Sequence, residues 1–475
     1  MFIGRQQELN FLETKYKSNK AEFIVLYGRR RICKTETLKE FCKNKKNVFY
    51  AGHECTNTVQ LEEFSKAIFA LQPETSRYFD SFKNWFDAFS FIADYNSEEK
   101  IIVVIDEFPY VCKGDKSIPS ILQNLWDHRL KELNIMLIIS GSSVSFIEDE
   151  LLGAKNPLYG RATGIYKMEP MPFEDAVKFF PNYSNEDKVL AYSILGGIPH
   201  YLMQFNPDAD LETNIREQIL TKGNTLYDEV EFLLHQELRE TAVYNAVIQA
   251  IALGNCAFND IYNKVQIDKP KLSVYLKNLI ELGIVVREFP VMTPSAQRVN
   301  VNRGEYRVTD NFFRFWYAYI YSHYSDIEAG DIEYLWNAVV KRELHFFASK
   351  TFETMAISYM RKLRRSGDLP FIFDTIGRWW GKVTHKDENG KPYTVSEEID
   401  VLAADKDEKN YMIGECKFTN EPFDLAQLKT LQNKLEINGE KYWYLFSLNG
   451  FTDAVKDAAR ENSNIQLVTL DDMLD

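Results

Sequence analysis

Short apolar runs alternate with helical patterns along the first 170 residues of the chain. The runs at 23–27, 48–51, 101–105 and 135–139 are almost entirely aliphatic or aromatic, which is typical of strands that are buried on both faces of a parallel sheet. Between these runs, apolar residues recur at helical spacing, as they do over 118–133. The pattern predicts an α/β fold in which helices cover a parallel sheet.

A different pattern begins near residue 238. Helical spacing predicts three helices at 246–252, 258–265 and 272–282, and two short strands follow at 284–288 and 306–308. Three helices and a hairpin in this order indicate a winged helix, whose third helix can enter the major groove of DNA. Winged helices inside ATPases also serve as lids or protein contacts, so both alternatives stay open. The third helix is expected to have an inner face of Leu272, Leu276, Leu279 and Ile280 and an outer face of Lys269, Lys271, Ser273, Tyr275 and Lys277.

The last third of the chain predicts a second α/β region. Aromatic residues at 312–321 have helical spacing and are expected to pack in a core rather than to stack on bases. A helix is expected around 349–360. Strands at 397–403 and 411–418, joined by a polar turn, predict a hairpin.

The length and composition of the chain limit the number of domains and the classes of function that we expect. A chain of 475 residues is too long for one core, so two to four domains are expected. The net charge of −13 argues against a chain that coats nucleic acid along its whole surface, although a local basic face remains compatible with it. The 6 cysteines are scattered, which indicates reduced thiols and not a disulfide framework. With neither a leader nor a long apolar run, we expect a cytoplasmic protein without membrane contact.

The segment 28–35 has the chemistry of a phosphate-binding loop. A glycine follows the first predicted strand, and Lys34 and Thr35 open a predicted helix, as in G-x-x-x-x-G-K-[ST]. Backbone N–H groups would surround the phosphates of ATP, Lys34 would reach the terminal ones and Thr35 would bind Mg²⁺. The expected nucleotide-binding residues of the loop are Gly28, Arg29, Arg30, Arg31, Ile32, Cys33, Lys34, Thr35 and Glu36.

Cys33 occupies the position where this motif has its second glycine. A side chain there crowds the approach of the backbone to the phosphates and resists a positive φ, should the loop need one. Affinity or hydrolysis could be reduced. A thiol next to Lys34 at a helix start is also expected to have a lowered pKa.

A second nucleotide signature is the acidic pair Asp106 and Glu107, which follows the strand at 101–105. Ligands bind at the carboxyl ends of strands in open α/β sheets. Asp106 would hold Mg²⁺ and Glu107 would orient the attacking water. The serines after 135–139 could sense the γ-phosphate or cap a helix. Arg161 is a candidate cation for phosphoryl transfer, in its own chain or in a neighbouring copy, or else a surface ion pair.

Acidic residues near the C-terminus predict a second site. In the hairpin, Glu415 and Lys417 project from one face of their strand and are brought towards Asp400. Two carboxylates form a hard oxygen site for Mg²⁺ or Mn²⁺, which Glu353 could complete from its helix. The metal would activate water, and Lys417 could stabilise developing charge, as in a nuclease. A purely structural pattern of charges is the alternative.

With both sites described, the chain resembles the archaeal and bacterial P-loop ATPases of the AAA+/STAND group that carry a C-terminal DUF234 domain. The matching segments extend over nearly the whole chain, at 2–9, 28–35, 106–107, 157–161, 196–199, 376–381, 398–400 and 414–417. The resemblance implies a P-loop NTPase sheet with a helical lid, a winged helix, and a C-terminal α/β restriction-endonuclease-like domain of the PD-(D/E)xK type. It also implies that Gly4, Arg5 and Pro199 lie near the adenine.

We therefore expect a multidomain protein. The expected domains are an ATPase core at 1–195, a helical lid or linker at 196–237, a winged helix at 238–310, connecting helices at 311–345 and a nuclease-like domain at 346–475. The expected function is an ATPase whose nucleotide state controls DNA binding and Mg²⁺-dependent DNA cleavage. The alternative is a nucleotide-dependent switch that binds DNA or a protein without cleaving, and a homo-oligomer is compatible with either.

Overall fold

The computed structural model describes residues 2–75, 79–95, 97–298, 304–386 and 391–474. The chain divides into two compact units. Unit 1 comprises residues 1–175 and 198–200, and unit 2 comprises residues 176–197 and 201–475. Each unit is described by itself. Within the described ranges, no helix combines the length and the apolar character that a membrane span needs.

Unit 1 contains the predicted parallel sheet. Its five strands lie in the order β2-β3-β4-β1-β5, and all neighbouring pairs are parallel. The strands are β1 (Glu22–Tyr27), β2 (Asn47–Ala51), β3 (Ile101–Asp106), β4 (Ile135–Gly141) and β5 (Gly164–Lys167). Every residue of β1, β3 and β4 is buried, as their continuous apolar sequences predicted.

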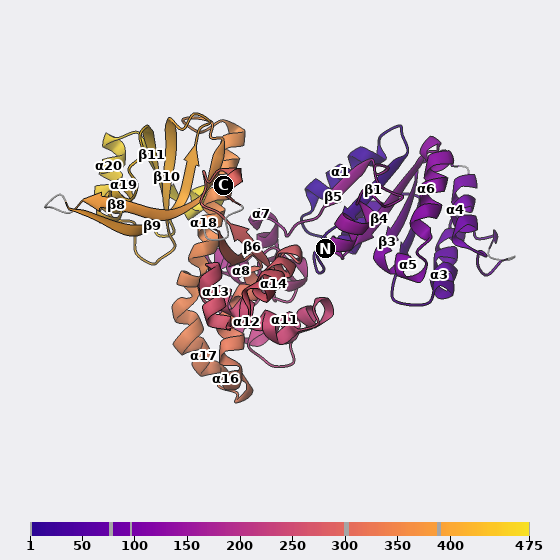
Figure 1. Ribbon diagram of the computed structural model, residues 1–475, viewed down its shortest axis with the longest axis horizontal. Helices are drawn as coiled ribbons and strands as arrows, with labels where there is room; N and C mark the ends of the chain where they lie inside the picture. The colour runs from indigo at the N-terminus through magenta and orange to yellow at the C-terminus, as the bar shows by residue number, and fades with distance from the viewer. Residues whose placement is uncertain (1, 76–78, 96, 299–303, 387–390, 475) are drawn as a thin grey trace. The chain divides into compact units, whose positions relative to one another are not determined.

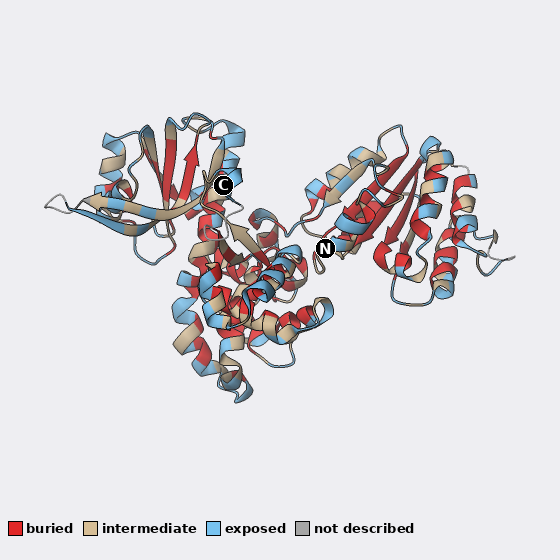
Figure 2. Ribbon diagram, viewed as in Figure 1, coloured by how far each residue is buried: buried red, intermediate tan, exposed pale blue. Residues whose placement is uncertain are grey.

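Helices cover both faces of this sheet (Figures 1 and 2). One face carries α1 (Gln6–Tyr16) and α2 (Lys34–Cys42), and the other carries α3 (Asn57–Phe69), α4 (Trp85–Asp94), α5 (Phe108–Gly114) and α6 (Ile118–His128). The predicted helix at 118–133 ends early, at His128, and a short 3-10 turn follows it. α7 (Phe173–Ala176) and α9 (Pro199–Leu202) lie where the chain passes between the units.

The first part of unit 2 is helical. It comprises α8 (Asn185–Leu195), α10 (Leu211–Asn214), α11 (Thr225–Glu237), α12 (Thr241–Ala252), α13 (Phe258–Val265) and α14 (Lys269–Glu281), followed by the antiparallel strands β6 (Val285–Glu288) and β7 (Glu305–Val308). The predicted order of three helices and a hairpin is therefore present. The expectation that Ile280 faces inward is wrong, because its side chain is 39% exposed. It lies about 80° around the helix from Leu272, at the margin of the apolar face.

Short helices lead from β7 into the longest helix of the described residues. They are α15 (Asn311–Phe315), α16 (Tyr324–Glu328) and α17 (Ile332–Leu335), and the aromatic side chains at 312, 313 and 315–317 are fully buried, as expected of a core. α18 (Lys341–Ser366) then extends over 26 residues. It ends at Gly367, whose φ of 86° closes the helix in the left-handed conformation that favours glycine.

A mixed sheet forms the C-terminal part of unit 2, in the order β12-β11-β10-β9-β8. β8 (Thr375–Lys386), β9 (Pro392–Ala404) and β10 (Asn410–Lys417) are antiparallel neighbours, whereas β10, β11 (Glu440–Ser447) and β12 (Ile465–Thr469) are parallel. α19 (Leu425–Lys434) and α20 (Asp453–Glu461) pack in the apolar core against this sheet, and α18 and α21 (Leu470–Leu474) also adjoin it. The predicted fold class is confirmed: a parallel α/β sheet and a separate C-terminal mixed sheet with helices.

Candidate functional site

The loop between β1 and α2 begins with a glycine that the backbone requires. A Cβ atom at Gly28 would lie 2.5 Å from the carbonyl oxygen of Met168, and the φ of Gly28 is 154°. Close packing of the loop against the segment after β5 therefore excludes a side chain at this position. The loop ends where α2 begins at Lys34.

Lys34 is directed back into its own loop. Its side chain is buried, and Nζ donates hydrogen bonds to the carbonyl oxygens of Gly28, at 3.0 Å, and Arg29, at 3.1 Å. Burial lowers the pKa of Lys34, which Glu107 and Asp106 partly oppose. An ammonium group held only by neutral carbonyls in a buried loop matches the charge of a phosphate. Among the other predicted loop residues, Arg30 Nη2 donates to the Tyr110 hydroxyl at 3.3 Å, Ile32 is buried, and Glu36 is exposed in the first turn of α2.

Cys33 adopts the conformation that the loop needs. Its φ of 61° and ψ of 42° lie in the left-handed region, directly before α2. Glycine reaches this region without strain, whereas any other residue is strained there. The expectation of a lowered thiol pKa is wrong, because burial, assisted by Glu36, raises the pKa of Cys33 to about 11. The nearby positive charges of Arg5 and Lys34 act in the opposite direction but do not outweigh desolvation.

The order of the strands brings Asp106 to the phosphate loop. β4 lies between β3 and β1, so the ends of all three strands meet at one edge of the sheet. Thr35 Oγ1 donates to Asp106 Oδ2 at 2.5 Å, and Ser140 Oγ donates to Asp106 Oδ1. Asp106 is 1% exposed. A threonine hydroxyl and a carboxylate in contact are the hard oxygen ligands that Mg²⁺ prefers, so these residues fit a nucleotide-bound Mg²⁺.

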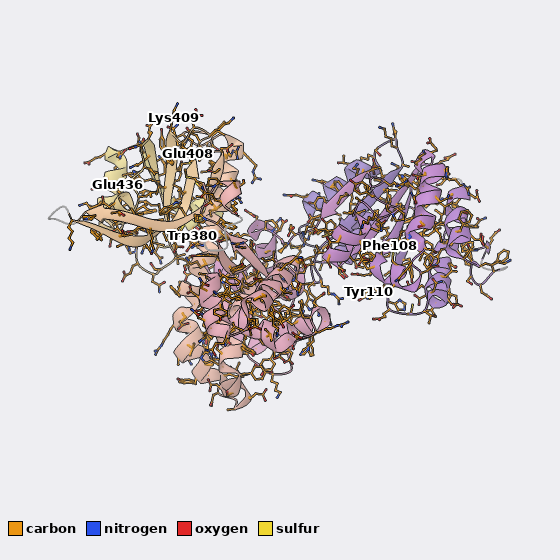
Figure 3. All side chains as sticks on the ribbon, in the orientation of Figure 1. Phe108, Tyr110, Trp380, Glu408, Lys409 and Glu436 are labelled. Carbon is orange, nitrogen blue, oxygen red and sulfur yellow. The ribbon has the colours of Figure 1, made fainter. Side chains whose placement is uncertain are left out.

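Glu107 lies next to this pair and is held by a different serine. Its φ is 50°, again in the left-handed region. Its Oε2 accepts hydrogen bonds from the Ser142 hydroxyl, at 2.8 Å, and from the Ser142 N–H, at 3.2 Å. Phe108 and Tyr110, labelled in Figure 3, follow it in α5. Ser140, in the last part of β4, and Ser142, directly after β4, thus orient the two acidic residues of the edge.

Arg5 ties the N-terminal segment to the outside of the loop. The side chain is 3% exposed; Nη1 donates to Glu8 Oε1 at 2.7 Å and to the Glu169 carbonyl at 2.6 Å, and Nη2 donates to the Ile32 carbonyl at 3.0 Å. Gly4 precedes it with a φ of 70°. Pro199 opens α9, where the His200 N–H donates to the Arg31 carbonyl at 3.4 Å. These residues border the loop, and Arg5 is engaged in protein contacts.

Arg161 is held in an ion pair. Its guanidinium contacts both carboxylate oxygens of Asp127, with the Nη2–Oδ2 distance at 2.7 Å, and its Nη1 donates to the Pro157 carbonyl at 2.7 Å. Hydrogen bonding by Arg161 lowers the pKa of Asp127. Of the two roles expected from the sequence, the structure thus displays the ion pair.

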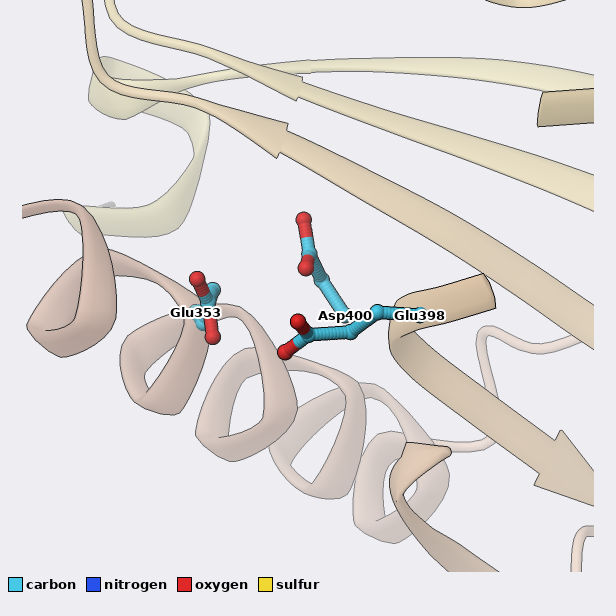
Figure 4. Close-up of side chains that lie close together, drawn as sticks. All are labelled: Glu353, Glu398 and Asp400. Carbon is cyan, nitrogen blue, oxygen red and sulfur yellow. The ribbon is translucent and has the colours of Figure 1, made fainter. Parts of the chain in front are cut away.

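A second cluster of carboxylates lies between α18 and β9. Oxygen atoms of Glu353, Glu398 and Asp400 lie within 4.8 Å of one another (Figure 4). Two cations already contact them. Arg378, on β8, contacts Glu353 at 3.1 Å and also Glu398, and Lys350 contacts the same two residues at 3.0 and 3.4 Å. The oxygen ligands suit Mg²⁺ or Mn²⁺, and a metal ion would have to displace one or both of these cations.

Asp400 sits where the strands β9 and β10 separate. Their pairing ends at Val401 and Gly414, and Asp400 Oδ2 instead accepts the Cys416 N–H at 2.9 Å. Burial raises the pKa of Asp400, and burial together with the charge of Asp400 raises the pKa of Glu353 to about 7. These groups therefore resist carrying two negative charges at once without a nearby cation.

Glu415 is adjacent but differently paired. Its Oε2 accepts a hydrogen bond from Lys434 Nζ at 2.7 Å. Burial and then Asp400 raise the pKa of Glu415, while Lys434 and Lys417 oppose the shift. Gln427 belongs to the capping box that begins α19. Asp400, Glu415 and Lys417, which the sequence brought together, thus interact electrostatically, and Glu398 joins Asp400 and Glu353 in the group of oxygens within 4.8 Å.

Sequence reasoning missed Glu398, Lys350, Arg378 and Lys434. Glu398 stands two residues before Asp400 on one strand, so the rule that such residues share a face could have found it. Lys350 and Glu353 are one helical turn apart, a weaker signal. No local signal points to Arg378, because a register shift in the β8–β9 pairing between Gly377 and Trp379 sets its position.

Comparisons with known proteins find family matches for both the N-terminal and the C-terminal parts of the chain. Residues 2–205 match a family model described as an ATPase domain predominantly from Archaea, and residues 316–433 match one described as archaeal and bacterial proteins of unknown function. An uncharacterised protein of Methanocaldococcus jannaschii is 32% identical over 481 residues, which cover 99% of this chain and 100% of the relative. An uncharacterised ATP-binding protein of the same organism is 56% identical over 46 residues, 10% of this chain and 78% of that protein.

A solved structure extends the agreement in fold. The Walker-type ATPase PABY2304 of Pyrococcus abyssi matches with a TM-score of 0.52 and 20% identity, covering 67% of this chain and 96% of that one. With its phosphate loop, its acidic strand end and a full-length relative, this chain belongs to the archaeal and bacterial family that joins an ATPase domain to a C-terminal domain of unknown function, and it is a nucleotide-binding protein of the ATPase type.

Proposed function

We propose that the protein is an ATP-dependent switch that binds Mg²⁺ with ATP in unit 1 and controls the binding of DNA by unit 2. The observation that carries the proposal is the pairing of a buried, carbonyl-bound Lys34 with an Asp106 that both Thr35 and Ser140 contact. Phosphates of ATP would replace the loop carbonyls as partners of Lys34. Thr35 and Asp106 would hold Mg²⁺, and Glu107 would orient the attacking water.

The residues that border the loop receive proposed roles as well. The loop 28–36 would bind the phosphates, and Gly4, Arg5 and Pro199 would lie near the base. Because Arg5 is buried among carbonyls and Glu8, its role would be to fix the loop and not to meet the phosphates directly. Arg161 would reach a nucleotide only after leaving Asp127, which a neighbouring copy of the chain in a homo-oligomer could bring about.

We propose an ATPase core at 1–195, a helical lid at 196–237, a winged helix at 238–310 and connecting helices at 311–345. Support for DNA contact comes from α14, where Lys269, Lys271, Ser273 and Lys277 are exposed on one helix. Tyr275 is half-buried and its hydroxyl donates to Glu240. Three exposed lysines on a third helix supply the positive charge that phosphate contacts require.

DNA binding measured by fluorescence anisotropy in three nucleotide states tests the switch. We expect the Kd for duplex DNA to differ at least severalfold between Mg·ATP, Mg·ADP and no nucleotide. Lys34→Ala and Asp106→Asn should abolish the difference, because each removes a proposed ligand of the nucleotide or of Mg²⁺. Lys39→Ala, an exposed lysine of α2, is the matched control and should retain it. Equal binding in all three states would refute the proposal.

A second function, metal-dependent DNA cleavage, is favoured by the convergence of Glu353, Glu398 and Asp400 beside Glu415 and Lys417. Burial raises the pKa of Glu353, Asp400 and Glu415, and the charge of Asp400 adds to the rise at Glu353 and Glu415. A divalent cation would neutralise these carboxylates, so they are suited to bind one. We propose residues 346–475 as a nuclease-like domain with Mg²⁺ or Mn²⁺ at these carboxylates and Lys417 beside the scissile phosphate.

Incubation of the full chain with single-stranded, duplex and branched DNA and Mg²⁺ or Mn²⁺ tests cleavage. Asp400→Asn and Lys417→Ala should abolish cutting, whereas Lys409→Ala, an exposed lysine of the β9–β10 turn (Figure 3), should not. Cutting that persists in both site variants, or that never occurs with either metal, would leave the switch as the function of the protein.

A further inference from the structure

A basic groove lies within unit 2. It is lined neither by the acidic pair Asp106 and Glu107 nor by the carboxylate cluster of Glu353, Glu398 and Asp400. It has a volume of about 540 Å³ and is formed by the segment after β6, the last turns of α18 and the beginning of β8. Four arginines line it, one from the segment after β6 and three from α18: Arg298, Arg361, Arg364 and Arg365. Asp374 is the one acidic residue among those lining it.

The arginines are concentrated by helix geometry. Positions 361, 364 and 365 are three and four residues apart, so their side chains leave α18 on one face. α18 ends directly after them, at Ser366. The segment after β6 reaches the groove because the Val291 N–H donates to the Arg378 carbonyl on β8 at 2.8 Å. Elements that are far apart in sequence are thus held together around the four guanidinium groups.

These cations are not neutralised within the groove. All four are exposed. Arg298 Nε donates to the Thr293 carbonyl at 3.1 Å, and the Arg364 guanidinium lies 5.0 Å from the centre of the Phe373 ring, so two of them are also oriented. Among the described residues, no carboxylate forms an ion pair with any of the four. In a chain with a net charge of −13, such a concentration of unpaired positive charge is a local exception.

Compensation of the helix dipole explains only part of this arrangement. The C-terminus of a helix carries the equivalent of about half a negative charge, which one arginine satisfies. Three arginines in the last turns, with a fourth from another element, exceed that need. Planar guanidinium groups gathered around a groove are suited to the phosphate groups of a nucleic acid backbone.

The groove also leads towards the carboxylate cluster. Arg361 and Arg364 follow Glu353 on α18 by 8 and 11 residues, which places them about 12 and 16 Å further along the helix axis. On β8, Ile376 lines the groove, and Arg378, which contacts Glu353 and Glu398, stands two residues later. A strand of nucleic acid that lies in the groove would therefore extend towards those carboxylates.

We infer that this arginine groove binds the phosphodiester backbone of a nucleic acid strand and is the principal DNA contact of the protein, in place of the exposed face of α14. The inference rests on the proposed function, in that it assigns the surface through which the switch holds DNA.

The test compares two triple variants of the full chain: Arg361→Ala/Arg364→Ala/Arg365→Ala for the groove and Lys269→Ala/Lys271→Ala/Lys277→Ala for α14. Anisotropy with single-stranded and duplex DNA is recorded at several salt concentrations. For the groove variant we expect a Kd at least tenfold higher and a slope of log Kd against log salt that is lower by about 2 to 3, because up to three phosphate contacts are lost. The affinity for nucleotide should not change.

Three controls keep the test decisive. Arg342→Ala removes an exposed arginine from the first turn of α18 and should leave the Kd unchanged. The triple exchange of the groove arginines for lysine retains the charge and should preserve most of the salt dependence, so it separates loss of charge from loss of fold. Inorganic phosphate, added at the concentration of DNA phosphate, should not compete, since a single phosphate spans one contact and not several.

The outcomes separate this inference from the proposed function. Nucleotide-dependent DNA binding that survives in the groove variant and is lost in the α14 variant would overturn the groove and leave the switch intact. A wild-type protein that binds no nucleic acid in any nucleotide state would overturn both.

Discussion

Cys33 is where the phosphate loop departs most from its motif at the scale of single residues. The sequence predicted that a side chain there would resist a positive φ, and the structure shows that the loop imposes a φ of 61° on it. A non-glycine residue in the left-handed region is strained by about 1 kcal/mol. The strain is tolerated, since the loop still closes around Lys34.

Cys33→Gly should relieve this strain and leave more space for phosphates in the loop. We expect severalfold tighter ATP binding and a higher rate of hydrolysis, because the backbone can approach the phosphates without a side chain. The stability gain should be at most about 1 kcal/mol, since glycine also loses more entropy on folding. Calorimetric titration with ATP and urea unfolding measure the two effects. Cys33→Ser keeps the Cβ atom and is the control; if it behaves as the glycine variant does, the missing glycine is irrelevant.

The thiol of Cys33 should also be unreactive at neutral pH. Because its pKa is raised to about 11, the thiolate that attacks alkylating reagents is scarce below that pH. At pH 8 we expect alkylation by iodoacetamide to be roughly a hundredfold slower than for a free thiol of ordinary pKa, with the rate rising about tenfold per pH unit up to pH 10. Mass spectrometry of the peptide that contains Cys33 follows this rate. A rate that levels off near pH 8 would contradict the assigned burial effect.

The two sites differ in how far single residues could be predicted. Lys34, Thr35 and Asp106 follow from a motif whose spacing fixes the loop and from a strand pattern that fixes the sheet edge, so their contacts were foreseeable. The partners of Asp400 depend on the pairing of three strands and one helix. Glu398 was within reach of strand periodicity, whereas Arg378 depends on a register shift that no periodicity encodes.

The same contrast holds for whole elements. β1, β3 and β4 were predictable because each is buried on both faces and is therefore continuously apolar. The hairpin of β8 and β9 extends over 12 and 13 residues, yet much of it is exposed or half-buried. Outside 397–403, which was predicted as a strand, its sequence therefore lacks the alternation that predicts one. For this reason only residues 376–381 of β8 stood out in the sequence, as one segment of the family resemblance. β8 nevertheless carries Arg378, the cation that contacts the carboxylate cluster.

Arg378→Met should test whether β8 closes that cluster. The Arg378 side chain is 9% exposed and contacts Glu353 and Glu398, and its guanidinium lies 5.6 Å from the ring centre of Trp380. Trp380 is labelled in Figure 3. Without metal we expect a loss of stability of about 3 kcal/mol, because the buried carboxylate of Glu353 and the exposed carboxylate of Glu398 both lose a partner. Mn²⁺ should restore much of it by occupying the vacated position and should bind at least tenfold more tightly than to the wild type.

Thermal unfolding and calorimetric titration with and without Mn²⁺ measure this pair of effects. Lys382→Met removes an exposed cation from the same strand and should change neither the stability without metal nor the affinity for Mn²⁺. Destabilisation without any recovery in Mn²⁺ would identify Arg378 as a purely structural partner of the carboxylates, and the cluster as no metal site.

At the scale of the whole molecule, the distribution of charge and the division into two compact units bear on different predictions. The net charge of −13 argued against general coating of nucleic acid, whereas the phosphate loop, α14 and the arginine groove each hold several positively charged residues. The chain forms two compact units, the first ending at residue 175 with a short return at 198–200. The finer boundaries within the second unit stay predictions, since the proposed connecting helices pack directly on α18 through the rings of Phe315, Tyr319 and Phe347.

Two compact units predict two unfolding transitions, and ATP should distinguish coupled from independent units. Mg·ATP at a hundredfold excess over its Kd stabilises the unit that binds it by about 2.7 kcal/mol. If nucleotide state controls DNA binding, part of that energy must reach unit 2, because a ligand changes a distant equilibrium only through a coupling free energy. We therefore expect scanning calorimetry to show both transitions moving to higher temperature with Mg·ATP, the first by more than the second. Lys34→Ala should abolish both shifts. A second transition that stays fixed while the first moves would mean that unit 2 does not sense the nucleotide, and the switch would then lack its physical basis.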